Sequence, residues 1–185
     1  MRLFVAVNLP EEVRRAVGAA IAPLRAIEAP VQWVDAGRMH ITIQFLGSVD
    51  DARAGPLGDA LADAVSGLKT FEVMAGGAGA FPDLAYPRVL WLGVEHHPAL
   101  ELLAHDVART LGRFGFEPEL RPFQPHITIG RAAKDADGGA LCAVTDRLGA
   151  IEWSSVVPVE SVDLMESIPG QDYRVARRAA LGGGA

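Results

Sequence analysis

A tetrapeptide that occurs twice constrains this chain more than any other feature. The sequence His-Ile-Thr-Ile occupies residues 40–43 and again residues 126–129, each time in a β-branched stretch typical of a strand. Because side chains alternate between the two faces of a strand, the His and Thr of each copy point one way and both Ile side chains point the other. If the strands lie side by side, two imidazoles and two hydroxyls converge on one volume in front of an apolar layer.

The competing explanations for the repeat are chance and a structural role, in which each His is a half-buried strand residue with a backbone partner. Threonine supplies five of the 185 residues, so a given His has about a 3% chance of a Thr two positions on. Two such cases among five His therefore indicate that His40 and His126 act together in one site. The other three histidines lack this context and are expected to be solvated or structural, since His96 and His97 precede Pro98 in a polar connection and His105 falls inside a predicted helix.

Composition narrows the classes of protein that this chain can belong to. With 50% hydrophobic and 22% charged residues, the chain is long enough for one sizeable core or two small lobes. A net charge of -6 argues against a surface that tracks long duplexes, so a nucleic-acid substrate is expected to be held at one end. The lone Cys142 predicts a buried structural thiol and a cytoplasmic protein, and the apolar start at residues 3–7 is too short for a signal peptide or membrane span.

Hydrophobic periodicity predicts an α+β fold with antiparallel sheets. No linker is long enough to separate domains, so residues 1–180 are expected to form one bilobal domain, with 181–185 as a flexible tail. The copies of the tetrapeptide lie about 86 residues apart, which suggests two lobes related by a pseudo-twofold axis, each donating one His and one Thr. The expected elements are strands at 3–7, 31–34, 39–46, 71–74, 87–94, 125–129, 156–166 and 173–180, and helices at 11–24, 51–68 (regular only after Pro56), 100–111 and 141–148.

Two histidines without a further ligand suit acid–base chemistry better than metal binding. Catalytic zinc usually takes three protein ligands, and neither motif has an Asp, Glu or Cys at ligand spacing. A Gly-x-Ser-x-Gly nucleophile motif is also missing from the sequence. A reference pKa near 6.5 lets one His accept a proton while the other donates one, as in-line displacement at phosphorus requires. The Thr hydroxyls are then placed to donate to the phosphoryl oxygens.

The motifs and their surroundings resemble the 2H phosphoesterase superfamily, and within it the bacterial and archaeal RNA 2′,3′-cyclic phosphodiesterases, also called 2′-5′ RNA ligases. The resemblance extends over nearly the whole chain and rests on residues 2–10, 33–34, 40–47 and 121–131. It implies a bilobal fold with two antiparallel sheets and outer helices flanking a central cleft. It also implies hydrolysis of a terminal RNA 2′,3′-cyclic phosphate to a 2′-phosphomonoester, with no metal and no cofactor.

The resemblance assigns roles that the symmetry of the two motifs leaves open. His40 would donate a proton to the departing 3′ oxygen, His126 would accept one from water, and Thr42 and Thr128 would hold the phosphate. Arg131 would contact phosphate at the cleft mouth, with a surface salt bridge as the alternative.

Several aromatic and basic residues have weaker assignments. Phe4 is considered for stacking on a base, although a core role is more common for such an aromatic. Trp91 is expected in the core, on the strand face opposite Arg88. Arg121 and Tyr173 are considered for substrate binding, with a structural role favoured for each.

Three other activities stay open at this point. They are ATP-independent 2′-5′ joining of RNA ends, hydrolysis of other small cyclic phosphates, and a non-catalytic module that binds RNA ends or nucleotides. The expected partners are RNA 3′ ends or small cyclic-phosphate nucleotides, with no membrane, and a monomer is the default state.

Overall fold

The computed structural model describes residues 1–119, 121–170 and 172–182. Helices and strands follow one another in a mixed order, which confirms the α+β class. The elements are β1 (Arg2–Asn8), α1 (Glu11–Arg25), β2 (Val31–Trp33), the 3₁₀ turn η1 (Ala36–Arg38), β3 (His40–Ser48), α2 (Asp51–Val65), β4 (Phe71–Phe81), β5 (Val89–Val94), α3 (Pro98–Gly112), β6 (His126–Ala132), α4 (Gly138–Gly149), β7 (Ser154–Val159), β8 (Ser161–Ser167) and β9 (Arg174–Ala180).

All the strands belong to one antiparallel sheet. Its order is β7-β4-β5-β6-β3-β1-β8-β9, and β2 pairs with β6 beside this path. The two sheets expected from the sequence are the two halves of this sheet. They are joined between β3 and β6, where the register places Ile41 opposite Ile127. The two copies of the tetrapeptide therefore lie side by side at the junction, as predicted.

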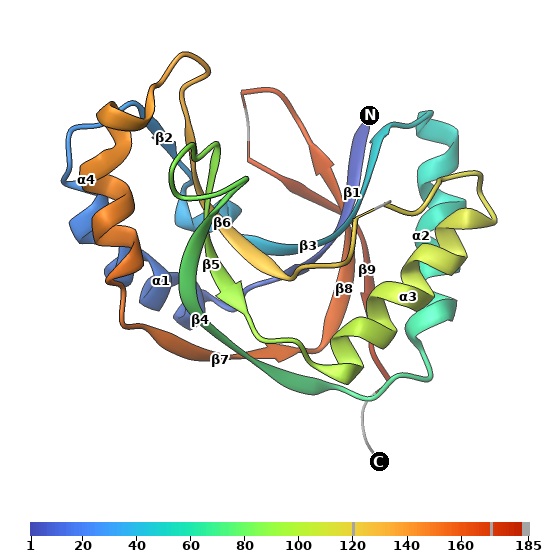
Figure 1. The fold of residues 1–185 in the computed structure, drawn as a ribbon. Helices are drawn as coiled ribbons and strands as arrows, with labels where there is room; N and C mark the ends of the chain where they lie inside the picture. Colours follow the sequence, from blue (N-terminus) through green and yellow to red (C-terminus); the bar gives the residue numbers. More distant parts are fainter. Residues whose placement is uncertain (120, 171, 183–185) are drawn as a thin grey trace.

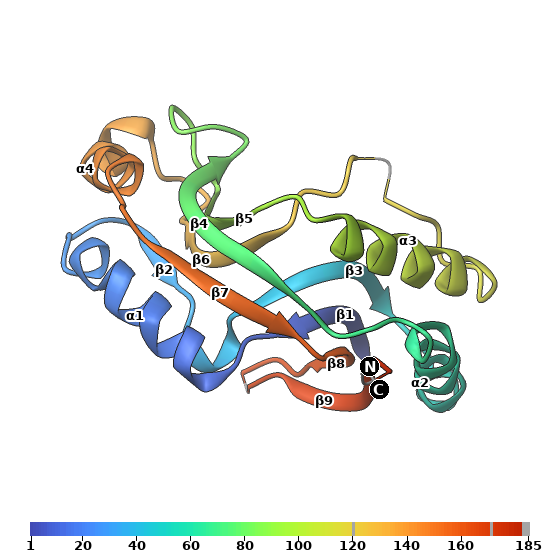
Figure 2. The same cartoon turned by 90° about the horizontal axis from the view of Figure 1, so that it is seen from below.

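Two lobes flank this junction (Figure 1). We call β1, β3, β8 and β9 with helices α2 and α3 the first lobe, and β2, β4, β5, β6 and β7 with helices α1 and α4 the second lobe. Helix α1 follows β1 in the chain but packs against β7 and α4, while α3 follows β5 but packs against β3 and α2. Figure 2 shows α1 beside β7 and α3 on the opposite side of the molecule. Each lobe thus receives one helix from each half of the chain.

Helix amphipathicity explains how the helices cover the outer faces of the sheet. In α1 the buried residues recur every three or four positions, at Val13, Val17, Ile21 and Leu24. They join a core cluster that includes Ile41 and Ile127, both fully buried. Burial of each such side chain stabilises the fold by about 1.5–3 kcal/mol. Because the Ile side chains of both motifs occupy this core, the His and Thr side chains face the other way.

Two β-bulges shift the side-chain phase of β3. The register with β1 pairs Ala6 with Thr42 and then Val5 with Gln44, so Ile43 is an extra residue. A second shift, between Phe4–Phe45 and Leu3–Gly47, leaves Leu46 unpaired. A bulge moves all later side chains to the other face of the strand. Phe45 therefore shares a face with His40 and Thr42, although a regular alternation from Thr42 would turn it away.

The structure corrects several expected element bounds. Helix α2 is regular from Asp51 rather than only after Pro56, because the Asp50 side chain caps it by accepting from the Ala52 N–H at 2.9 Å. Pro56 lies inside the helix, where it removes one backbone donor. The expected strand at 156–166 is two strands in different lobes, since β7 pairs with β4 and β8 with β1. The strand expected at 31–34 is β2 (Val31–Trp33), which pairs with β6.

Further expectations concern the C-terminal part of the chain. Cys142 is exposed rather than buried, because it lies outside the face of α4 that buries Leu141, Val144 and Leu148. In the expected tail, Leu181 is buried and its N–H donates to the Glu160 carbonyl at 2.9 Å, while residues 183–185 lie outside the described residues. No helix in the described part of the chain is both long and apolar enough to cross a membrane.

Candidate active site

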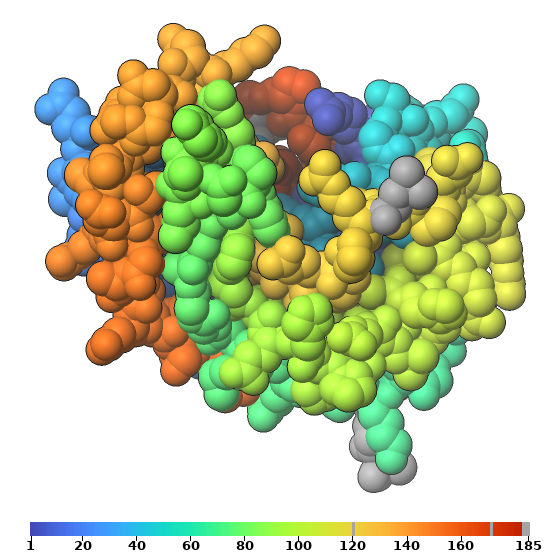
Figure 3. All heavy atoms as spheres, viewed as in Figure 1, coloured from blue at the N-terminus to red at the C-terminus, as the bar shows by residue number. Residues whose placement is uncertain are grey.

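A pocket of about 440 Å³ opens between the two lobes. The space-filling view shows the surface hollowed there (Figure 3). Strands β1 and β3 supply one wall and β6 supplies the other. The pocket brings together both motif histidines, both motif threonines, Arg131 and Phe4, and of the two weaker candidates for substrate binding it includes Tyr173. The lining residues are Arg2, Leu3, Phe4, Val34, Arg38, His40, Thr42, Phe45, Gly47, Phe81, Val89, His126, Thr128, Arg131, Ser167 and Tyr173.

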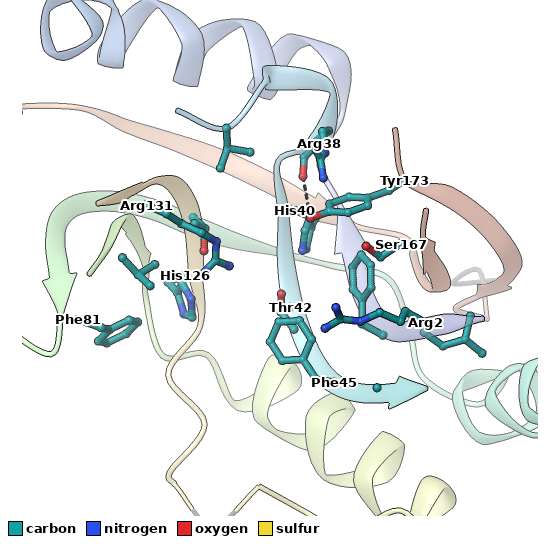
Figure 4. A pocket seen from close by; sticks show the side chains of 16 residues that line it. Arg2, Arg38, His40, Thr42, Phe45, Phe81, His126, Arg131, Ser167 and Tyr173 are labelled. Carbon is teal, nitrogen blue, oxygen red and sulfur yellow. Dashed lines mark hydrogen bonds between the residues drawn. The ribbon is translucent and has the colours of Figure 1, made fainter. Parts of the chain in front are cut away.

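The two histidines are held in the same way. The Nδ1 atom of His40 lies 2.7 Å from the Arg38 carbonyl oxygen, and Nδ1 of His126 lies 2.7 Å from the Gln124 carbonyl oxygen. A carbonyl oxygen only accepts, so each Nδ1 donates, which fixes the tautomer of the ring. Nε2 of each ring remains available to exchange a proton. Figure 4 shows both rings facing the same space from neighbouring strands.

Where β3 and β6 meet, the His of each motif lies across from the Thr of the other motif. Because the strands run antiparallel and Ile41 lies opposite Ile127, the residue before Ile41 corresponds to the one after Ile127. His40 is thus placed across from Thr128, and Thr42 across from His126. All four side chains are partly exposed and line the pocket. An anion in the pocket therefore meets a hydroxyl and an imidazole from each lobe.

The environment of His40 strongly favours its neutral form. The pKa of His40 is lowered from 6.5 to about 4, chiefly by burial, while the hydrogen bond to Arg38 acts in the opposite direction. The charges of His126, Arg131 and Arg38 lower the pKa further. Arg131 and Arg38 therefore lie close enough to His40 for their charges to influence its pKa. A bound anion would offset their charge and restore proton affinity to His40.

Positive charge dominates the pocket although the chain as a whole carries a net charge of -6. Arg2, Arg38 and Arg131 line it, and none of the lining residues is acidic. Arg131 thus lies where the sequence predicted, at the end of the second motif strand. Arg38 was not predicted, because in the sequence it reads only as part of a turn. Its guanidinium lies 4.4 Å from the centre of the Tyr173 ring, which holds it at the pocket wall.

Aromatic side chains support each imidazole. The Phe4 and Tyr173 rings lie 4.9 and 5.4 Å from that of His40, and the Phe81 ring lies 5.0 Å from that of His126. Phe4 is only 4% exposed and packs with Ala6 and Met165, which agrees with the core role favoured from the sequence and leaves little surface for stacking on a base. Phe45 is 59% exposed beside it, with ring centres 6.1 Å apart. The sequence missed Phe45 because the bulge at Ile43 changes its face.

Trp91 also differs from the sequence expectation. It is half-buried beside the cleft rather than in the core, 6.4 Å from the His126 ring. Its position depends on Gly79, which pairs with it across β4 and β5. A Cβ at Gly79 would lie 2.5 Å from the indole ring. The run of glycines and alanines at residues 76–80 of β4 therefore makes room for Trp91.

Other candidate residues lie away from this pocket. The Arg88 guanidinium donates to the carbonyls of Ala133 and Lys134, at 3.1 and 2.9 Å. Arg121 lines a separate pocket beside α3. His96 lies 3.1 Å from Glu101, and His97 caps α3 by accepting from the Ala99 N–H at 3.2 Å. These contacts agree with the structural roles expected for both histidines. Across the described ranges, no three His, Cys, Asp or Glu residues gather in a way that suits a metal ion.

Comparison with known proteins places this geometry in a family. The model of the 2′-5′ RNA ligase superfamily matches residues 9–168. The RNA 2′,3′-cyclic phosphodiesterase of Methanothermobacter thermautotrophicus is 32% identical over 167 residues, which cover 90% of each chain. The protein of the same name from Thermotoga maritima is 37% identical over 131 residues, covering 71% of this chain and 70% of that one.

Solved structures give the same result over the whole length. The crystal structure of TT0787 of Thermus thermophilus matches with a TM-score of 0.76 and 27% identity, covering 100% of both chains. Escherichia coli LigT complexed with 3′-AMP matches with a TM-score of 0.74 and 29% identity, covering 97% of both. By sequence and by fold, this chain belongs to the 2′-5′ RNA ligase superfamily.

Proposed function

We propose that the protein hydrolyses a terminal RNA 2′,3′-cyclic phosphate to a 2′-phosphomonoester, without a metal, with His40 and His126 as acid and base. The observation that carries this proposal is the equivalent placement of the two imidazoles. Each donates through Nδ1 to a carbonyl at 2.7 Å, and each keeps Nε2 for proton exchange on the same pocket. Curated relatives at 32% and 37% identity are named RNA 2′,3′-cyclic phosphodiesterase, which supports the same substrate class.

In the proposed reaction a water oxygen attacks phosphorus and the bond from phosphorus to the 3′ oxygen breaks. Nε2 of His126 takes a proton from the attacking water, and Nε2 of His40 gives a proton to the departing 3′ oxygen. The products are a 2′-phosphate and a 3′-hydroxyl. Each turnover leaves His126 protonated and His40 neutral, so proton exchange with solvent restores the starting state.

The surroundings of the two histidines support this division of roles. The leaving oxygen belongs to the ribose, so the acid is expected on the side where the nucleoside binds. Phe45, the exposed aromatic of the pocket, follows His40 and Thr42 on β3. A base on Phe45 would lie on the β3 wall of the pocket, which carries His40, whereas β6 carries His126. Stacking of a base on an aromatic side chain contributes about 1–3 kcal/mol.

Substrate binding raises the pKa of His40, which then takes its proton from solvent. In the unliganded pocket its pKa of about 4 keeps it neutral at pH 7. The cyclic phosphate carries one negative charge, which counters Arg38 and Arg131 and raises the pKa of His40. Thr42 and Thr128 then donate to the nonbridging oxygens as negative charge grows on them in the transition state.

The test is an assay on an oligonucleotide that ends in a 2′,3′-cyclic phosphate, with a chelator present. A 2′-phosphate product formed at the same rate with and without chelator supports the proposal. A 3′-phosphate product would contradict the assigned regiochemistry, and loss of activity with chelator would contradict the metal-free mechanism. Adding RNA with a 5′-hydroxyl end tests for 2′-5′ joining, in which that hydroxyl replaces water. Binding without turnover would instead indicate a non-catalytic module.

We also propose that one chain suffices for activity, because β3 and β6 of the same chain supply both motifs. A monomeric cytoplasmic enzyme that acts on RNA 3′ ends or small cyclic-phosphate nucleotides fits this arrangement. Sedimentation of the active protein at assay concentration tests the oligomeric state.

A further inference from the structure

We propose that Arg2 forms a second anion subsite, which binds the 5′-phosphate of the nucleotide whose cyclic phosphate lies between His40 and His126. The inference rests on the proposed function and specifies its substrate class. The preferred substrates are ribonucleotides that carry a 5′-phosphate, either as a terminal group or as the linkage to the rest of an RNA strand.

The order of side chains along β1 and β3 carries this inference. The register between the two strands pairs Asn8 with His40, Ala6 with Thr42, Phe4 with Phe45 and Arg2 with Ser48. These pairs share the face that opens into the pocket. From the His40 end of the register to the Arg2 end, the side chains that face the pocket are therefore an imidazole and a hydroxyl, then an exposed aromatic ring, then a guanidinium. A nucleotide has the same order, with a 3′-terminal phosphate, a nucleoside and a 5′-phosphate.

The spacing agrees with one nucleoside between the two anion sites. From Ala6, beside Thr42, to Arg2 the strand advances four residues, or about 13 Å. The Arg2 side chain lines the pocket and points into it (Figure 4), which brings its guanidinium nearer to the phosphate site than its Cα. Phe45 lies between the two along the strand, where it is placed to hold the base.

The register between β1 and β3 separates Arg2 from the reaction centre. Arg38 and Arg131 are among the charges that lower the pKa of His40, whereas Arg2 lies at the other end of β1, opposite Ser48. Arg2 nevertheless lines the same pocket, which has no acidic lining residue. Two arginines thus act where the cyclic phosphate binds, and the third provides positive charge at a distance. A second negative group on the substrate is the natural counterpart of that charge.

Arg2 is also well anchored for such a role. Its backbone pairs on one side with Ser48 of β3 and on the other with Ser167 of β8, so its Cα is fixed within the sheet. Within the described residues its guanidinium has no hydrogen-bond or ion-pair partner at the present geometry. Ser167 lines the pocket next to it and offers a hydroxyl donor.

A binding experiment tests the subsite without relying on turnover. Titration calorimetry compares adenosine 2′,5′-bisphosphate with adenosine 2′-monophosphate. The unmodified protein is expected to bind the bisphosphate about 10-fold more tightly at low salt, and higher salt should reduce this preference. In Arg2→Gln the preference should fall to about 1, and Arg2→Lys should keep part of it. Arg15→Gln removes an exposed arginine of α1 outside the pocket, and should keep the full preference.

Hydrolysis then distinguishes failure of the subsite from failure of the proposed function. The ratio of kcat/KM for adenosine 2′,3′-cyclic phosphate with and without a 5′-phosphate should be about 10 in the unmodified protein and about 1 in Arg2→Gln. Hydrolysis with equal rates on both substrates, or a ratio that Arg2→Gln leaves unchanged, would overturn the subsite alone. If neither of these substrates nor the oligonucleotide with a 2′,3′-cyclic phosphate end is hydrolysed, the proposed function fails, and the binding preference still decides for or against the subsite.

Discussion

Ile41 lies opposite Ile127 at the point where β3 pairs with β6, and both side chains are fully buried. This pair fixes how the two histidines meet. Burial of the two Ile side chains on one face turns the flanking His and Thr side chains to the other, and the antiparallel register brings the two motifs together with their order reversed. The local twofold relationship of the pocket thus follows from one apolar contact between the lobes.

Replacing either histidine should remove the proton transfer that it performs. We expect His40→Ala and His126→Ala each to lower kcat/KM about 10²- to 10⁴-fold on a cyclic-phosphate substrate, with little change in melting temperature. His105→Ala, in which an exposed histidine of α3 is removed, is the matched control and should leave the rate unchanged. The double variant should lose far less than the product of the single losses. A large fall in melting temperature with an unchanged rate per folded molecule would mark that histidine as structural.

The lowered pKa of His40 predicts a dependence of stability on pH. Burial, with the nearby cationic groups, lowers this pKa from 6.5 to about 4, so between these values the unfolded chain binds more protons than the folded one. The contribution of His40 to the free energy of unfolding therefore rises with pH from about 4 to about 6.5 and is constant above. It should be about 2 kcal/mol smaller at pH 5 than at pH 7.

Urea unfolding at both pH values measures this effect. His40→Ala should show a smaller loss of stability on acidification than the unmodified chain, whereas His105→Ala should not. An equal loss in the His40→Ala variant would mean that the folded protein does not disfavour the charged imidazole.

Two glycine substitutions should act in opposite directions. In Gly79→Ala the new methyl group would lie 2.5 Å from the Trp91 ring, which then has to move toward Phe81 and His126. We expect loss of about 1–3 kcal/mol in stability together with lower kcat. In Gly18→Ala the methyl group meets nothing within 4 Å inside α1, so stability should rise by about 0.5–1 kcal/mol with unchanged kinetics. Thermal unfolding and steady-state rates on the same samples check both.

Removing the exposed aromatic of the pocket should weaken substrate binding. Phe45→Ala is expected to raise KM about 10-fold and to change kcat less, because stacking acts on the bound nucleoside and not on the reacting bond. Leu102→Ala removes an exposed apolar side chain of α3 and should change neither constant. An unchanged KM in Phe45→Ala would place the nucleoside elsewhere in the pocket.

The sequence predicts well that the two histidines and two threonines line one pocket, because their orientation depends on local alternation. His40 and Thr42, like His126 and Thr128, lie two positions apart in strands with buried Ile neighbours, and period-two patterning orients them without knowledge of the rest of the fold. The class of the fold follows in the same way from the periodicity of its elements. The family resemblance adds the cleft between the lobes.

Features that depend on pairing between distant strands are not visible in the sequence. Phe45 reaches the pocket because Ile43 is an extra residue opposite β1, and a bulge depends on the partner strand. Trp91 leaves the core because Gly79 lies across from it. The break between β7 and β8 is likewise set by the different strands with which they pair, β4 and β1.

The crossing of α1 and α3 between lobes bears on how the chain assembles. Each of these two helices packs against a strand from the other half of the sequence, so neither half can form its core alone. Folding is therefore expected to be cooperative and dominated by contacts distant in sequence, which slows it relative to a protein of two independently folding units.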